Sequence, residues 1–285
     1  MIGRLAICTI LAVLGTSATA EACASCGAGD PTLTLAGTEQ PFAGRLRLSL
    51  SAMSSATRSP SDRMAERRLA IGAAWAPVSW LMLSASAPLV LRSIETASLE
   101  RDTSIAPGDL DLRARFVVLR DRPMAPTHLI TLQIGTRVPL APALTDERGI
   151  ALADGAQTAS RTVTPLVGLA WSIYAAPFSL QTYLLAAIPT RGTDGLADAV
   201  EIRAASLAIV QVVPALSIVV GPETRLRIDQ SQVGDVGQAL FATFGAMLAA
   251  GDVTPYILVR VPVLSAFDDA HVELTSIELG ATLDV

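Results

Sequence analysis

The sequence predicts an all-β protein: a closed antiparallel transmembrane up-and-down β-barrel of about twelve strands. The chain is half hydrophobic and only 16% charged, with a mean hydropathy of +0.48, so it has more apolar surface than a soluble protein normally buries. Its apolar and polar residues alternate with a period of two, and its short turns alternate with long polar loops. No stretch after residue 20 is apolar for the ~20 residues that a spanning helix needs, which leaves the barrel as the way to cross a membrane.

Residues 1–20 have the pattern of a cleavable signal peptide. Arg4 supplies the positive charge, an apolar stretch runs from Leu5 to Leu14, and Ala18-Thr19-Ala20 forms a small-residue cleavage site. A buried first helix is the alternative, but this segment is too apolar to lie on a surface. We therefore expect an exported protein of the Gram-negative outer membrane.

Residues 21–43 are predicted to form a periplasmic N-terminal segment that contains Cys23 and Cys26. In an oxidising compartment, two thiols at this spacing most simply form a local disulfide. A redox pair or half of a soft-metal site are the alternatives. A c-type haem would need a histidine where Gly27 stands, and a zinc site lacks nearby partners. No metal or other cofactor is expected.

Residues 44–285 are predicted to form the barrel, with strands at about 44–53, 66–76, 79–91, 108–120, 127–139, 161–174, 178–190, 200–213, 215–228, 237–249, 252–263 and 273–285. Long polar loops are expected at about 54–65, 92–107, 140–160, 191–199, 229–236 and 264–272. Barrels of the outer membrane have short periplasmic turns and longer outer loops. This pattern places both termini on the periplasmic side.

Strict alternation gives each strand one polar face and one apolar face. If the apolar face meets lipid, the charged face lines the lumen. The predicted lumen-lining residues are Arg45, Arg47, Asp109, Asp111, Arg113, Arg115, Arg137, Glu201, Arg203, Glu223, Arg225, Arg227 and Glu278. The set either forms interstrand ion pairs that fill a narrow barrel or forms a constriction that selects polar and anionic solutes.

Aromatic residues gather near the predicted short turns. They are Trp75, Trp80, Phe116, Trp171, Tyr174, Phe178, Tyr183 and Tyr256. Tryptophan and tyrosine prefer the membrane interface because the ring is apolar and its polar atom needs water. We expect one aromatic girdle at the periplasmic rim.

Several functional classes are disfavoured by composition. The net charge is −5 and all 21 basic residues are arginine, without a basic cluster that would indicate nucleic-acid binding. The chain contains no asparagine, so a lipase triad of serine, histidine and asparagine cannot form. His128 comes just after a predicted tight turn and His271 lies in a predicted long loop, where a solvated surface role is the simpler interpretation. An enzyme is not expected.

Several short segments resemble the outer-membrane transporter family grouped with the MetA proteins of phenol-degradation pathways: Ala73–Trp80 leading to Ala85–Pro88, then Pro107–Phe116, and the strand end Val138-Pro139. The resemblance implies a barrel that moves small, often hydrophobic, compounds, and it assigns no role to individual residues. The leading hypothesis is a transporter or channel for small solutes with a mixed-charge lumen, in contact with outer-membrane lipid. The alternatives are a non-transporting structural or partner-docking barrel, whose Cys23–Cys26 segment meets a periplasmic protein, and a soluble secreted β-sandwich.

Overall fold

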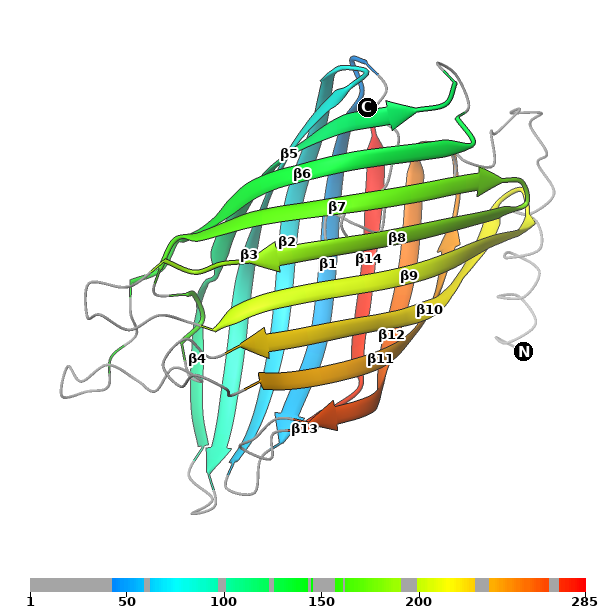
Figure 1. The fold of residues 1–285 in the computed structure, drawn as a ribbon. Coiled ribbons are helices and arrows are strands. Elements are labelled where there is room, and N and C mark those ends of the chain that lie inside the picture. Colours follow the sequence, from blue (N-terminus) through cyan, green and yellow to red (C-terminus); the bar gives the residue numbers. More distant parts are fainter. Residues whose placement is uncertain are drawn as a thin grey trace, which may run out of the picture.

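The computed structural model is a closed antiparallel β-barrel, which confirms the predicted fold class (Figure 1). Its wall has twelve strand positions, each called a stave below, and two of these positions are each filled by two consecutive short strands. The structure describes residues 43–58, 62–96, 101–122, 126–142, 145, 157–160, 162–190, 199–228, 236–266 and 272–285. The strands are β1 (Leu46–Arg58), β2 (Asp62–Val78), β3 (Leu81–Thr96), β4 (Arg101–Pro107), β5 (Asp109–Arg120), β6 (His128–Pro139), β7 (Thr164–Ala175), β8 (Phe178–Ala187), β9 (Val200–Val213), β10 (Leu216–Ile228), β11 (Val236–Leu248), β12 (Val253–Ala266), β13 (Val272–Glu273) and β14 (Ser276–Asp284).

The barrel closes because β1 pairs with both ends of the sheet. β1 is antiparallel to β2 along its whole length and to β14 from Arg47 to Ser54. β4 and β5 together form one stave beside β3, and β13 and β14 together form another beside β1. Closure satisfies the backbone of every stave, as a hydrocarbon environment requires.

Gly108 joins β4 to β5 and interrupts the alternation of side chains along this stave. Before Gly108 the even-numbered residues face inward, and after it the odd-numbered residues do. Its N–H donates to the carbonyl oxygen of Pro88 at 2.8 Å. A Cβ at this position would lie 2.9 Å from side-chain atoms of both Pro88 and Val90. The close approach to β3 therefore requires glycine here.

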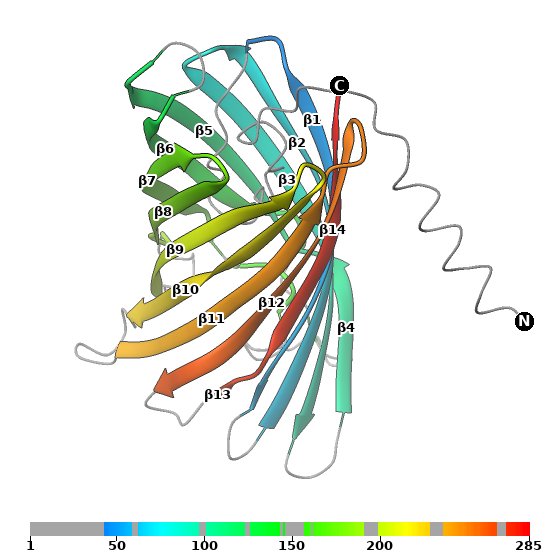
Figure 2. The ribbon, with the colours of Figure 1, turned by 90° about the vertical axis from the view of Figure 1, so that its right-hand side faces the viewer.

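Two of the predicted outer loops are largely strand. The segments expected as loops at 54–65 and 92–107 instead extend β1, β2 and β3 and form β4. Figure 2 shows these hairpins projecting at the lower end, beyond the neighbouring staves. Sequence patterning missed them because they continue past the apolar band, where the outward positions no longer need to be hydrophobic.

Exposed apolar side chains cover the outside of the barrel, including Leu48, Ile71, Leu132 and Leu169. Trp75, Trp80, Trp171 and Phe178 are exposed near the tight turns, at the positions of the expected girdle. Tyr183 and Tyr256 are buried instead, in phase with the inward residues of β8 and β12. Nearness to a turn did not distinguish the two faces of the strand.

The predicted signal peptide and the Cys23–Cys26 pair lie outside the described residues. Among the described residues, no helix is long and apolar enough to cross a membrane. No group of three or more potential metal ligands was found in the part of the chain that the structure describes.

Candidate functional site: the barrel interior

All thirteen predicted lumen-lining residues lie on the inward-facing phase of their strands. Arg47, Arg115, Glu223 and Glu278 are buried, and most of the others are partly buried. Arg227 is exposed at the loop end of β10, opposite Glu201 in the β9–β10 register. The period of two therefore placed these side chains on one surface, although it did not indicate which of them meet.

Seven of the inward charges form a continuous ionic belt near the loop end of the barrel. The belt consists of Asp111, Arg113, Arg137, Glu201, Arg203, Arg225 and Glu273. It runs through β5, β6, β9, β10 and β13.

Glu201 is the central carboxylate of the ionic belt. It lies 2.7 Å from Nε of Arg203 and 3.0 Å from Nε of Arg225. The Arg137 guanidinium approaches it to 3.8 Å from β6, across two intervening staves. The inward positions between them include Leu166 and Ala187, which carry no polar group, and Thr164, whose hydroxyl donates to the Thr162 carbonyl oxygen at 3.5 Å.

The two ends of the belt are also paired. Asp111 accepts hydrogen bonds from Nε of Arg113 at 2.5 Å and of Arg137 at 3.3 Å. At the other end, Arg225 donates to Glu273 at 2.8 Å, and its guanidinium lies 5.7 Å from the ring centroid of Phe241. Charge-assisted bonds of this kind fix side-chain geometry.

A second, more deeply buried cluster joins β10, β12 and β14. Arg260 donates to Glu223 at 3.0 Å and to Glu278 at 3.1 Å, and Glu278 also accepts the Tyr256 hydroxyl at 3.1 Å. The Tyr256 ring lies over Gly280, where a Cβ would come within 2.4 Å of it. The glycine makes room for the aromatic ring, which in turn positions the carboxylate.

Two further ion-pair groups lie at the two ends of the interior. Arg45 and Arg47 pair with Asp284 at the turn end, and Glu66 pairs with Arg68 and Arg92 at the loop end. Sequence reasoning missed Asp284, Glu66, Arg68, Arg92, Arg260 and Glu273. The alternation of Thr282, Leu283 and Asp284 could have identified Asp284, whereas Arg92 and Glu273 fell in or at the edge of predicted loops.

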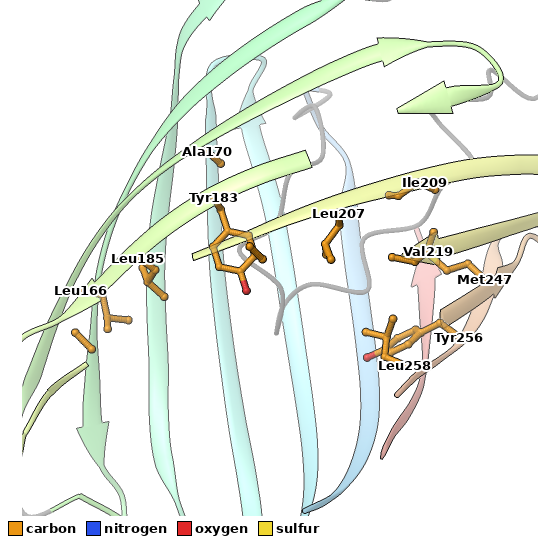
Figure 3. Close-up of a cluster of buried hydrophobic side chains, with 12 residues drawn as sticks. Leu166, Ala170, Tyr183, Leu185, Leu207, Ile209, Val219, Met247, Tyr256 and Leu258 are labelled. Atoms are coloured by element: carbon orange, nitrogen blue, oxygen red, sulfur yellow. The ribbon is translucent and has the colours of Figure 1, made fainter. Parts of the chain in front are cut away.

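The interior changes from charged to apolar along a single strand. From the loop end of β9 to its turn end, the inward side chains are Glu201, Arg203, Ala205, Leu207 and Ile209. Together with neighbours on β7, β8, β10, β11 and β12, the last three belong to a cluster of twelve buried apolar residues (Figure 3). This apolar wall lies beside the ionic belt, on its turn side.

Residues 157–160 of the β6–β7 connection contact the inward side of β3 and β5. Asp109 accepts the backbone N–H of Ser160 at 2.7 Å, and Arg92 donates to the carbonyl oxygen of Gln157. The Thr158 hydroxyl donates to the Pro107 carbonyl oxygen at 3.4 Å. Gln157 and Thr158 are themselves buried. This short segment therefore narrows the interior at its loop end.

The architecture is that of bacterial outer-membrane barrels. The structure is similar to the COG4313 outer membrane channel from Pseudomonas putida F1, with a TM-score of 0.68 and 12% identity over 86% of this chain and 96% of that one. It is also similar to the beta domain of the Bordetella autotransporter BrkA (TM-score 0.52, 12% identity, 86% and 100% covered). The translocator domain of the autotransporter NalP from Neisseria meningitidis has a TM-score of 0.50 at 10% identity, with 85% and 88% covered.

No family model and no curated protein matches the sequence. At these identities the structural likeness shows the fold, and the sequence resemblance to the MetA group stays a prediction.

Proposed function

We propose that this chain is an outer-membrane channel for small solutes, which pass through a mixed-charge lumen rich in arginine. The observation that carries the proposal is that the ionic belt remains partly exposed inside the barrel. The side chains of Arg203, Arg225 and Glu201 are 30%, 27% and 20% exposed, respectively. Exposed guanidinium groups on an inward face require water in the interior, so the belt lies on an aqueous path.

The charge of the belt favours anionic or polar solutes. Four arginines, Arg113, Arg137, Arg203 and Arg225, face three carboxylates, Asp111, Glu201 and Glu273. Rings of arginine attract anions, while the interspersed carboxylates limit how strongly an anion is held. A twelve-stave barrel is narrower than the 16- to 18-stranded porins, so the solutes must be small.

The proposed orientation places the tight turns and both termini in the periplasm and the projecting β1–β4 hairpins outside the cell. Residues 21–43 would follow the cleaved signal peptide and stay on the periplasmic side. The structural likeness to outer-membrane barrels supports this placement.

Planar-bilayer conductance of the refolded mature chain tests the proposal. We expect discrete current steps and, in a salt gradient, a reversal potential that indicates anion preference. Replacing Arg203 and Arg225 with glutamine should shift the preference toward cations. The matched control replaces Arg63 and Arg67, which face outward, and should leave the preference unchanged. If neither the mature chain nor a chain without residues 21–43 conducts, there is no open channel.

A non-transporting barrel is the second candidate, because part of the interior is tightly packed. Leu258 and Leu207 of the apolar wall are almost completely buried, and residues 157–160 narrow the loop end. A barrel closed in this way would serve as a structural or docking protein that presents residues 21–43 to a periplasmic partner. Absence of conductance together with disulfide-dependent capture of a partner by that segment would favour it.

A further inference from the structure

We propose that the outward face of β1, β2, β3, β5 and β6 holds one phosphorylated lipid of the outer leaflet. Arg58, Arg63 and Arg67 would bind its phosphate groups, and an apolar groove lower on the same face would hold an acyl chain. The inference uses the orientation proposed above but does not depend on transport through the barrel.

The three arginines form an outward-facing cluster on neighbouring strands. Arg58 and Arg63 are directly opposite each other in the β1–β2 register, and Arg67 follows on β2. All three are exposed, and no ion pair or hydrogen bond joins their guanidinium groups to other described residues. Like charges directly opposite on one face of a sheet are destabilising unless an anion lies between them.

One carboxylate lies near the cluster. Glu95 on β3 is opposite Arg63 and is also exposed. In the strand register Glu95 lies between Arg63 on β2 and Arg101 on β4, so it offsets at most one of the three positive charges and leaves the Arg67 side of the cluster basic. A phosphate group would supply the missing negative charge, and arginine binds phosphate in a two-pronged geometry.

An apolar track runs along the membrane-facing surface below Arg67. The outward positions that follow on β2 are Leu69, Ile71 and Ala73, beside Leu89, Ala87 and Ala85 on β3. Leu69, Ile71 and Leu89 are strongly exposed. The track leads from the arginines toward the tight-turn end without meeting a charge.

The track ends in a groove with a volume of about 640 Å³. Its floor is formed by the small residues Ala73, Ala85 and Ala114, and Trp75, Leu83, Leu112 and Ile134 rise around them. These residues occupy two adjacent cross-strand rows on β2, β3, β5 and β6. The groove fits a hydrocarbon chain. Because it lies in line with the arginines, the whole face suits a molecule that has both an acyl chain and a phosphate headgroup.

The vertical spacing agrees with an outer-leaflet lipid. Trp75 lies near the tight-turn rim, and Arg67 precedes it by eight residues on β2. Eight residues of strand span about 27 Å, and a tilt of about 40° reduces this to about 20 Å along the membrane normal. The apolar band of such barrels is about 25 Å tall. Arg67 therefore lies about 5 Å short of the far boundary, and Arg63 and Arg58, about 10 Å further along the membrane normal, lie in the headgroup layer.

Lipid binding to the full mature chain tests this proposal. Protein refolded in zwitterionic detergent is titrated with bisphosphorylated lipid A, and the bound complex is counted by native mass spectrometry. A basic residue at a membrane surface contributes about fivefold in binding to an anionic lipid, so the R58Q/R63Q/R67Q variant should bind on the order of 100-fold more weakly. The R122Q variant, changed at an exposed turn on the opposite rim, should bind within about twofold of the parent.

Two further binding measurements separate the contribution of the phosphate headgroup from that of the acyl chain. Dephosphorylated lipid A should bind as weakly to the parent as lipid A binds to the triple variant. The A85F/A114F variant, which fills the groove floor, should also weaken binding, while inorganic phosphate at the same concentration should not compete.

Equal binding of the two lipid A forms, full competition by inorganic phosphate, or unchanged binding by the triple variant would each overturn the proposal. Heat-modifiable gel mobility verifies that every variant is folded. Conductance is measured separately, so failure of lipid binding is distinguishable from failure of the channel.

Discussion

Replacing Glu201 with glutamine tests whether the ionic belt stabilises the barrel and sets its selectivity. The carboxylate meets Arg203, Arg225 and Arg137 at 2.7, 3.0 and 3.8 Å. At these distances and an effective dielectric constant of 20, the Coulomb attraction of each pair is about 4–6 kcal/mol. Removing the shared partner of a buried charge cluster typically costs about 3–5 kcal/mol. Because Glu201 is 20% exposed, water offsets part of this, and we expect a loss of about 3 kcal/mol.

Urea unfolding in phospholipid vesicles measures this loss, and bilayer reversal potentials measure the selectivity. E201Q leaves three neighbouring arginines without their common carboxylate, so anion preference should rise. The D252N control removes one charge from an exposed tight turn and should change neither quantity. A loss below about 1 kcal/mol combined with unchanged selectivity would refute the idea that Glu201 organises the belt.

Three further predictions concern packing and the turns. G280V should displace the Tyr256 ring and break the hydrogen bond from its hydroxyl to Glu278, which should lower the free energy of unfolding by about 1–3 kcal/mol. Y256F is the control that removes only the hydroxyl. Equal urea midpoints for G280V and the parent would contradict this prediction. G108V should separate the β4–β5 stave from β3 and release residues 157–160, which faster limited proteolysis between 140 and 163 would detect. Asp121 accepts the N–H groups of His128 and Thr127, and these bonds, with Arg122, lower its pKa. Since the folded pKa is depressed, the turn should be protected from amide exchange above about pH 4 and lose protection as pH falls further, a dependence that D121A should lack.

The period of two in the sequence predicted both the barrel and the set of inward-facing charged residues. Asp109, Asp111 and Arg113 alternate with leucine and alanine, and such a strand can have only one polar face. The aromatic girdle was predicted only in part, because Tyr183 and Tyr256 share the spacing of interface residues yet face inward. The distance of a residue from a turn predicts its position along the barrel axis. Whether its side chain faces inward or outward depends instead on its place in the alternation of the strand.

The outer ends of β1 to β4 were predicted as loops because the pattern there weakens. Arg63, Arg67 and Glu95 occupy outward positions that would be apolar within a membrane. Backbone pairing with a neighbouring strand holds these segments extended without any help from hydrophobic alternation.

By itself the sequence determined which face of each strand is polar and in what order the strands pair, since both depend on local alternation and short connections. Only the tertiary structure decided which charges meet. Arg137 and Glu201 are separated by two staves and Arg45 and Asp284 by nearly the whole chain, and the curvature and closure of the barrel bring them together. The reason is that the register and shear of a barrel are set by all of its strands together, whereas the alternation in one strand determines only which of its own side chains share a face.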